Sequence, residues 1–85
     1  MSPELAKLRL EIDGLDTRLV ALLNERAAVA LRIGAAKRGA PIYDPARERA
    51  VLQGIAAKNR GPLADNDLLD VYERIIAACR SIQST

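Results

Sequence analysis

Apolar residues recur at alternating intervals of three and four positions along the first part of the chain. They are Leu5, Leu8, Ile12, Leu15, Leu19, Leu22, Val29 and Ile33. This spacing is typical of a helix with one apolar stripe that packs along a neighbouring helix. Ser2, Pro3 and Glu4 supply a capping hydroxyl, a proline suited to the first helical position and an acid near the positive helix end. The pattern predicts a helix over residues 3–38, which ends at the Gly-Ala-Pro turn that follows.

Two shorter helices follow in the rest of the sequence. Asp44 and Pro45 repeat the capping signal, and the helix that they begin, over residues 45–59, precedes a second glycine-proline turn. A third helix over residues 65–83 carries the next apolar face. Its apolar positions are Leu68, Leu69, Tyr72, Ile75, Ile76 and Cys79. These patterns predict an all-α fold with three helices in a single domain, residues 1–85, without internal repeats.

The first helix is too long for a globule of this size. A helix over residues 3–38 measures roughly 50 Å, whereas a compact domain of 85 residues has a radius of gyration of about 12 Å. The apolar stripe of such a helix is covered most simply by the same helix of a second chain, in parallel or antiparallel orientation. The sequence therefore predicts an intertwined homodimer, in which two chains form a six-helix bundle.

The composition excludes several classes of function. Thirteen basic and eleven acidic residues are interspersed, and two tyrosines are the only aromatic residues, which argues against a nucleic-acid partner. The chain has no histidine, the commonest metal ligand and general base, so we expect neither a metal nor a cofactor. The single cysteine, Cys79, fits a reducing cytoplasm. We expect no signal peptide and no contact with a membrane, because no apolar run is long enough.

Arg26 interrupts the first apolar stripe, in the position where the next apolar residue belongs. An unpaired charge on a packed helix face is costly, so Arg26 needs a partner. Glu48 is one candidate, because it lies seven residues before Ile55 and therefore shares the buried face of the second helix. A bound anion is the other candidate.

Further polar residues lie on or beside the buried helix faces: Arg9, Lys37, Arg47, Cys79 and Gln83. Each of them alone is typical of an ordinary surface or core position. Together with Arg26 and Glu48 they describe a polar pocket inside a helix bundle. Its excess of positive charge suits a small dianion, because arginine pairs with carboxylates through two parallel hydrogen bonds.

Arg9 and Arg26 are too far apart along one helix to hold the same small molecule. Seventeen residues separate them, which corresponds to about 25 Å. If both serve one site, Arg9 comes from the partner subunit. A dimer with antiparallel long helices would achieve this and would contain two equivalent sites.

The candidate pocket lacks an evident nucleophile or general base, since Glu48 is its only inward-facing acid and is expected to be paired. What such a pocket supplies is orientation of the substrate and fixed electrostatics. These contributions suit a reaction whose barrier is conformational and electrostatic and which needs no proton transfer.

Several segments together resemble the all-helical class of chorismate mutases. They are LRLEIDGLDTRLVALLNERAAVALRIGAAK, YDPARERAVL and ERIIAACRSIQ, which cover nearly the whole of residues 8–83. The combination of LxxxIDxLDxxLxxLLxxR, IGxxK, DxxRE and the last glutamine is specific, although each part alone is weak. The family occurs alone or fused to prephenate dehydratase, prephenate dehydrogenase or the first shikimate-pathway synthase. The resemblance implies an intertwined dimer that converts chorismate to prephenate by a Claisen rearrangement, for phenylalanine and tyrosine biosynthesis.

The resemblance also implies how the two carboxylates of chorismate would be held. Arg26 would bind one of them and Arg9 from the partner subunit the other, while Arg47 would support the carboxylate-binding side. Many relatives carry a serine where this chain has Cys79. A thiol is a weaker hydrogen-bond donor, so a minor carboxylate contact would be weakened.

Two further residues are implied to act at the bond that breaks. Lys37 and Gln83 would donate to the ether oxygen from opposite sides, where negative charge develops as the C–O bond opens. Glu48 would accept a hydrogen bond from the ring hydroxyl, with the backbone at Asp44 nearby. The resemblance thus implies Lys37, Gln83, Arg26 and Arg9 as catalytic residues.

Two other functions compete with this interpretation. Isochorismate pyruvate lyase is a related helical dimer with a similar cationic pocket, and it eliminates pyruvate from an isomer of chorismate. A non-catalytic helical dimerisation or regulatory module would explain the long apolar stripe. Such a module would not explain the presence of Arg26, Glu48 and Gln83 on the buried helix faces.

Overall fold

The structure, a computed structural model, describes residues 2–83 and consists of three α-helices. Helix α1 spans Pro3–Ala36, α2 spans Pro45–Lys58 and α3 spans Asp65–Gln83, and no strand occurs within the described range. The predicted all-α fold with one long and two shorter helices is therefore confirmed. The predicted single domain also includes residues 1, 84 and 85, which lie outside the described residues.

The helices begin and end where local backbone chemistry requires it. The Ser2 hydroxyl accepts from the backbone N–H of Leu5 at 3.1 Å and caps α1. Helix α1 ends at Ala36, two residues before the expected end at residue 38. The reason is that Arg38 and Gly39 take positive φ angles of 49° and 91°, which cannot continue a right-handed helix.

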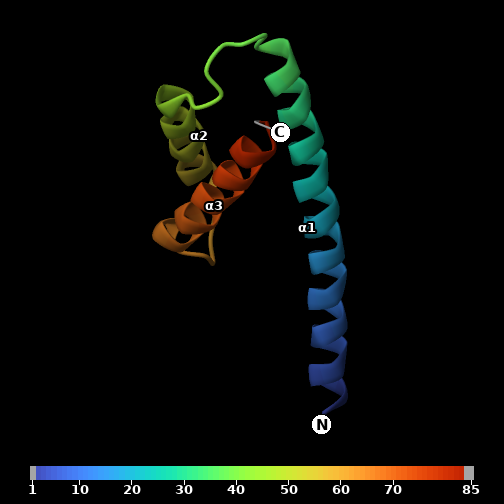
Figure 1. Cartoon of the computed structure of the whole chain (residues 1–85). Helices are drawn as coiled ribbons and strands as arrows, with labels where there is room; N and C mark the ends of the chain where they lie inside the picture. The colour runs from blue at the N-terminus through green and yellow to red at the C-terminus, as the bar shows by residue number, and fades with distance from the viewer. Residues whose placement is uncertain (1, 84–85) are drawn as a thin grey trace.

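Asn59 shapes the connection between α2 and α3. Its Nδ2 atom donates to the carbonyl of Leu63 at 2.9 Å and to the carboxylate of Asp65 at 2.7 Å. Its Oδ1 atom accepts from the backbone N–H of Gly61 at 3.1 Å, where φ is 73°. The side chain thus satisfies polar groups of a tight connection, and α3 folds back beside α2 (Figure 1).

Helix α3 lies between the other two helices and contacts both of them. The buried apolar residues among those described are Ala30 of α1 and Ile76 and Cys79 of α3. This small core holds α3 against the C-terminal half of α1. The N-terminal half of α1 extends away from α2 and α3 as a free arm (Figure 1).

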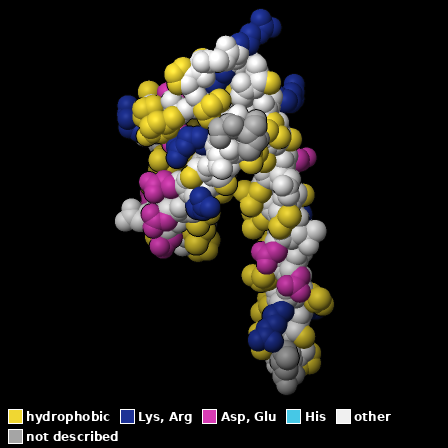
Figure 2. Space-filling model, in the orientation of Figure 1, with side chains coloured by type: hydrophobic (Ala, Val, Ile, Leu, Met, Phe, Trp, Pro, Cys, Tyr) yellow, Lys and Arg dark blue, Asp and Glu magenta, His cyan; other side chains and the backbone are white. Residues whose placement is uncertain are grey.

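The apolar stripe of α1 is uncovered in the single chain. The exposed large hydrophobic residues of α1 are Leu5, Leu8, Leu10, Ile12, Leu15, Leu19, Val20, Leu22, Leu23, Val29, Leu31 and Ile33. Figure 2 shows hydrophobic side chains along the whole projecting arm. The molecule measures 56 × 25 × 15 Å, and its radius of gyration of 16.3 Å exceeds the value of about 12 Å for a compact chain of this length. Such a long apolar surface is typical of a binding face.

No helix among residues 2–83 combines the length and the apolar character that crossing a membrane requires.

Candidate active site

A pocket of about 430 Å³ lies where the C-terminal half of α1, the following loop, the start of α2 and the end of α3 meet. Its lining combines apolar and charged side chains. The residues are Arg26, Val29, Ala30, Ile33, Lys37, Ile42, Asp44, Arg47, Glu48, Val51, Ile76, Cys79, Arg80 and Gln83. Each of the three helices contributes to it, so the pocket exists only in the folded chain.

Seven of the eight residues that the sequence singled out line this pocket: Arg26, Lys37, Asp44, Arg47, Glu48, Cys79 and Gln83. Arg9 does not. It lies on the exposed N-terminal arm of α1, about 25 Å along the helix from Arg26. Within one chain, Arg9 therefore belongs to a different part of the surface from the other seven.

Gln83 closes one side of the pocket against α1. Its Nε2 atom donates to the backbone carbonyl of Ala30 at 2.9 Å. This contact requires the two helices to approach closely, and Gly34 permits the approach. A Cβ atom at Gly34 would lie 3.3 Å from both the Cβ and the carbonyl oxygen of Gln83.

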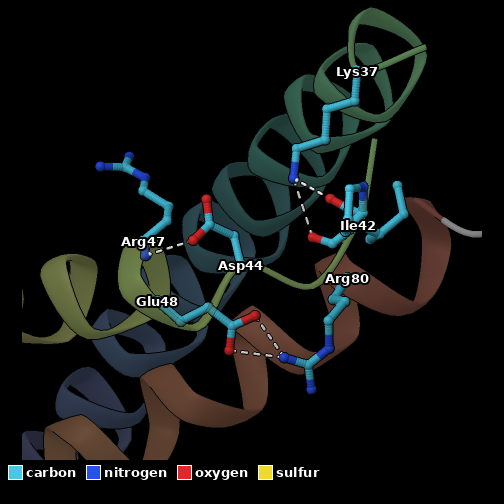
Figure 3. A network of polar contacts seen from close by, with 7 residues as sticks. Lys37, Ile42, Asp44, Arg47, Glu48 and Arg80 are labelled. Atoms are coloured by element: carbon cyan, nitrogen blue, oxygen red, sulfur yellow. Dashed lines mark hydrogen bonds and ion pairs between the residues drawn. The ribbon is translucent and has the colours of Figure 1, made fainter. Parts of the chain in front are cut away.

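Lys37 folds over the loop that follows α1 (Figure 3). Its Nζ atom donates to the carbonyl oxygens of Pro41 and Ile42, each at 3.1 Å. An ammonium group has three N–H donors, so one remains for a ligand. Lys37 is half-buried and lines the pocket, so it places a positive charge at the edge of the cavity.

Glu48 pairs with Arg80 and not with Arg26. The Nη1 atom of Arg80 lies 2.8 Å from one carboxylate oxygen of Glu48 and 2.6 Å from the other. Of the two partners considered for Arg26 from the sequence, Glu48 is thereby engaged elsewhere. Within residues 2–83, Arg26 makes no ion pair, and its half-buried guanidinium lines the pocket.

Arg80 is a pocket residue that the sequence reasoning missed. It lies four residues after Ile76, the same spacing that places side chains on one helix face, and three residues before Gln83. That register was the available signal. Residue type alone does not distinguish it, because a basic residue in the last turn of a helix is also favoured by the helix dipole.

Asp44 and Arg47 lie at the N-terminus of α2. The Asp44 carboxylate accepts from the backbone N–H of Arg47 at 3.0 Å, so it caps the helix. The Arg47 side chain is exposed and extends away from the Glu48–Arg80 pair (Figure 3). Cys79, by contrast, is a buried free thiol on the floor of the pocket.

The pocket carries more positive than negative charge. Four cationic side chains and two carboxylates belong to its lining, and one of these carboxylates is already paired with Arg80. A small anion with two carboxylates would therefore meet Arg26 as an unengaged guanidinium and Lys37 as a fixed ammonium. The amide of Gln83 adds a neutral donor to the pocket lining.

Comparison with known proteins identifies relatives over nearly the whole chain. The family described as chorismate mutase type II matches residues 8–84. The bifunctional chorismate mutase/prephenate dehydratase of Aquifex aeolicus is 42% identical over 86 residues, which is 94% of this chain and 24% of that protein. The enzyme of the same description from Neisseria gonorrhoeae is 38% identical over 72 residues, 85% of this chain and 20% of its own length.

Solved structures show the same fold. Chorismate mutase from Thermus thermophilus, form II, superposes with a TM-score of 0.92 at 30% identity, covering 95% of this chain and 94% of that one. Chorismate mutase from Helicobacter pylori in complex with prephenate gives 0.91 at 34% identity, with 98% and 92% covered. The chain spans about a quarter of the length of the curated relatives it matches. The family match over residues 8–84 shows that this chain belongs to the chorismate mutase type II family.

Proposed function

We propose that this chain catalyses the rearrangement of chorismate to prephenate. The observation that carries the proposal is the convergence of Arg26, Lys37, Glu48 and Gln83 on one pocket. Relatives described as chorismate mutases, one of them in complex with prephenate, support the choice of substrate. The reaction breaks the C–O ether bond and forms a C–C bond in one cyclic shift of electrons. No proton is transferred, so the pocket needs only to orient the substrate and stabilise developing charge.

The substrate's carboxylates are assigned to arginines. Arg26 binds one of them, because its guanidinium faces the pocket without an ion-pair partner among residues 2–83. Arg47, in the first turn of α2, also lines the pocket and supports the carboxylate side. Cys79 lines the floor and contributes at most a weak donor.

The ether oxygen is assigned to Lys37 and Gln83. As the C–O bond opens, negative charge grows on this oxygen, and donors fixed in advance stabilise it without reorganisation. Lys37 keeps one N–H beyond the two that hold the loop carbonyls. The Gln83 amide keeps one N–H beyond the contact with Ala30. Glu48 accepts from the ring hydroxyl, near the backbone of Asp44.

The complete site needs a second copy of this chain. The exposed stripe of α1 supports an intertwined homodimer, because burial of each leucine side chain is worth about 1.5–3 kcal/mol and the stripe finds no cover within residues 2–83. In the dimer, Arg9 of the partner subunit reaches the second carboxylate. This assignment explains why Arg9 lies far from the pocket of its own chain.

Purified protein incubated with chorismate tests the proposal through the disappearance of chorismate and the appearance of prephenate. The same protein with isochorismate tests for the lyase, which would release pyruvate and salicylate. Formation of prephenate in the presence of EDTA is the expected result, since no metal or cofactor is proposed. A dicarboxylate mimic of the transition state should raise the melting temperature of an enzyme, whereas a pure dimerisation module would show no shift.

The cytoplasmic location of this protein stays a prediction.

A further inference from the structure

The Glu48–Arg80 pair has a geometry that leaves the carboxylate available to a ligand. A single nitrogen of Arg80, Nη1, contacts both carboxylate oxygens, at 2.8 and 2.6 Å. A carboxylate offers about four lone-pair sites, so each oxygen of Glu48 retains acceptor capacity. Glu48 can therefore accept from a hydroxyl group while Arg80 still holds it.

The guanidinium of Arg80 is itself held from a second direction. Its Cζ atom lies 4.7 Å from the centroid of the Tyr43 ring, the distance of a cation–π contact. Tyr43 directly follows Pro41 and Ile42, whose carbonyls bind the ammonium of Lys37. A continuous set of contacts thus connects Lys37, its loop, Arg80 and Glu48. Figure 3 shows the contacts of Lys37 with the loop and those of Arg80 with Glu48 as dashed lines.

The position of the pair also argues for a role in the site. Glu48 and Arg80 line the main pocket and a neighbouring pocket of about 310 Å³, so the pair forms part of the wall between the two. The side chains are 25% and 36% exposed, respectively. An ion pair of this exposure contributes little to the stability of the fold. A bound substrate would shield the pair from water and strengthen it.

We propose that Arg80 is a positioning residue, which orients the Glu48 carboxylate to accept a hydrogen bond from the ring hydroxyl of the substrate. The inference rests on the proposed function and adds to it a residue that controls recognition of that hydroxyl. Arg80 does not touch the reacting atoms in this assignment. Its loss should therefore act through Glu48 and only on substrates that carry the hydroxyl.

Steady-state kinetics of Arg80→Leu test this role with chorismate and with the analogue that lacks the ring hydroxyl. Leucine keeps bulk in the wall between the two pockets and removes the donors. For chorismate we expect kcat/KM to fall by about fivefold or more, mainly through KM, because the hydroxyl contact exists in both ground and transition states. For the analogue we expect a loss below about twofold. Equal losses on both substrates would overturn the inference.

A double-mutant cycle separates positioning from a structural effect. Once Glu48→Gln is present, adding Arg80→Leu should cost less than about twofold further in kcat/KM, because the two residues act as one unit. Fully additive losses would overturn the inference. Arg80→Lys should recover part of the loss, since it keeps a charge but not the planar group that stacks on Tyr43. If Arg80→Leu does not fold, Tyr43→Leu replaces it, with a smaller loss that again depends on the hydroxyl.

Arg74→Leu is the matched control, because Arg74 is an exposed arginine of α3 outside both pockets. It should retain wild-type kinetics on both substrates. Wild-type turnover of chorismate with an unaffected Arg80→Leu variant would contradict this inference alone. A wild-type chain that leaves chorismate unchanged would contradict the proposed function and this inference with it.

Discussion

The side-chain amide of Gln83 donates from Nε2 to the backbone carbonyl of Ala30 at 2.9 Å, across 53 residues of sequence. The contact joins the last turn of α3 to the core of α1. Because a carbonyl oxygen accepts only from an N–H group, this contact orients the side-chain amide of Gln83 with its nitrogen toward α1. The second N–H of that nitrogen is the donor that we assign to the ether oxygen of the substrate.

An amide does not ionise, so the role of Gln83 brings no pH dependence of its own. We expect turnover that is nearly flat from about pH 5 to 9, the interval between the reference pKa values of carboxylic acids and lysine. Measurement of kcat/KM across this range checks it. A steep acid optimum in the wild-type chain would contradict the role of Gln83.

Gln83→Glu should lose activity at neutral pH and regain part of it in acid. The introduced carboxylate would face the carbonyl of Ala30 with no proton to donate, which raises its pKa and leaves only the protonated form active. The activity of this variant is therefore expected to rise as the pH falls. Gln53→Glu makes the same change at an exposed site of α2 outside the pocket and should keep the flat profile. Equal profiles for both variants would contradict the prediction.

Gly34→Ala should lower kcat by displacing Gln83. The added Cβ would meet the Cβ and the carbonyl oxygen of Gln83 at 3.3 Å, tighter than an ordinary van der Waals contact. A shift of a few tenths of an ångström misaligns the donor, and we expect a loss of about threefold or more in kcat. Steady-state kinetics and a thermal melt of the same sample measure the two effects separately.

Gly54→Ala is the control for this substitution, because nothing lies within 4 Å of a Cβ at that helical position. There the alanine should stabilise the chain by about 0.5–1 kcal/mol through helix propensity and leave the kinetics unchanged. Full activity of Gly34→Ala would show that the close approach of the two helices has no bearing on Gln83.

Arg26→Ala should raise KM and lower kcat together, since its carboxylate contact exists in the ground state and in the transition state. Loss of a charged hydrogen bond is worth about 1.5–3 kcal/mol, which corresponds to about ten- to hundredfold in kcat/KM. Stability should change little, because Arg26 makes no ion pair within residues 2–83. Arg32→Ala, an exposed site of α1 outside the pocket, should keep wild-type kinetics.

Mixing two impaired variants tests whether Arg9 acts across the dimer. Arg9→Ala chains and Arg26→Ala chains, each of low activity alone, should reach about a quarter of wild-type activity after equal mixing and subunit exchange. Half of the dimers are then mixed, and each mixed dimer contains one intact site of its two. If Arg9 acted within its own chain, the mixture would show no more activity than the two single variants.

Dilution provides an independent check of the same dimer. Activity per chain should fall once the protein concentration drops below the dissociation constant of the dimer. Sedimentation of the same samples should show the loss of dimer over the same range. Constant activity in monomeric samples would contradict a site completed by the partner subunit.

Local chemistry explains why the helices could be predicted. Ser2 and Asp44 are capping residues followed by proline, and both cap their helices in the structure. The end of α1 was less predictable, because Arg38 adopts a positive φ that its residue type does not require. Such a conformation depends on the loop that follows, where Pro41 and Ile42 are held by Lys37.

Part of the site could be predicted from the sequence. It consists of polar residues on a helix face that also carries apolar residues, because that face points inward. Arg26, Glu48 and Gln83 share the faces of apolar neighbours, so their inward direction followed from helix periodicity. The partner of Glu48 did not follow from it. Periodicity tells which helix face a side chain occupies but not which of several nearby charges it contacts. In the structure, Glu48 forms its ion pair with Arg80 of α3.

The sequence by itself determined three helices, their caps and the apolar stripe of α1, because these depend on neighbours within a few positions. It also determined which polar side chains share the buried faces. Only the tertiary structure decided that α3 lies between α1 and α2, that Gln83 reaches Ala30, and that Glu48 pairs with Arg80 and leaves Arg26 for a ligand. Those contacts join distant residues, and their choice depends on how the helices approach one another in space.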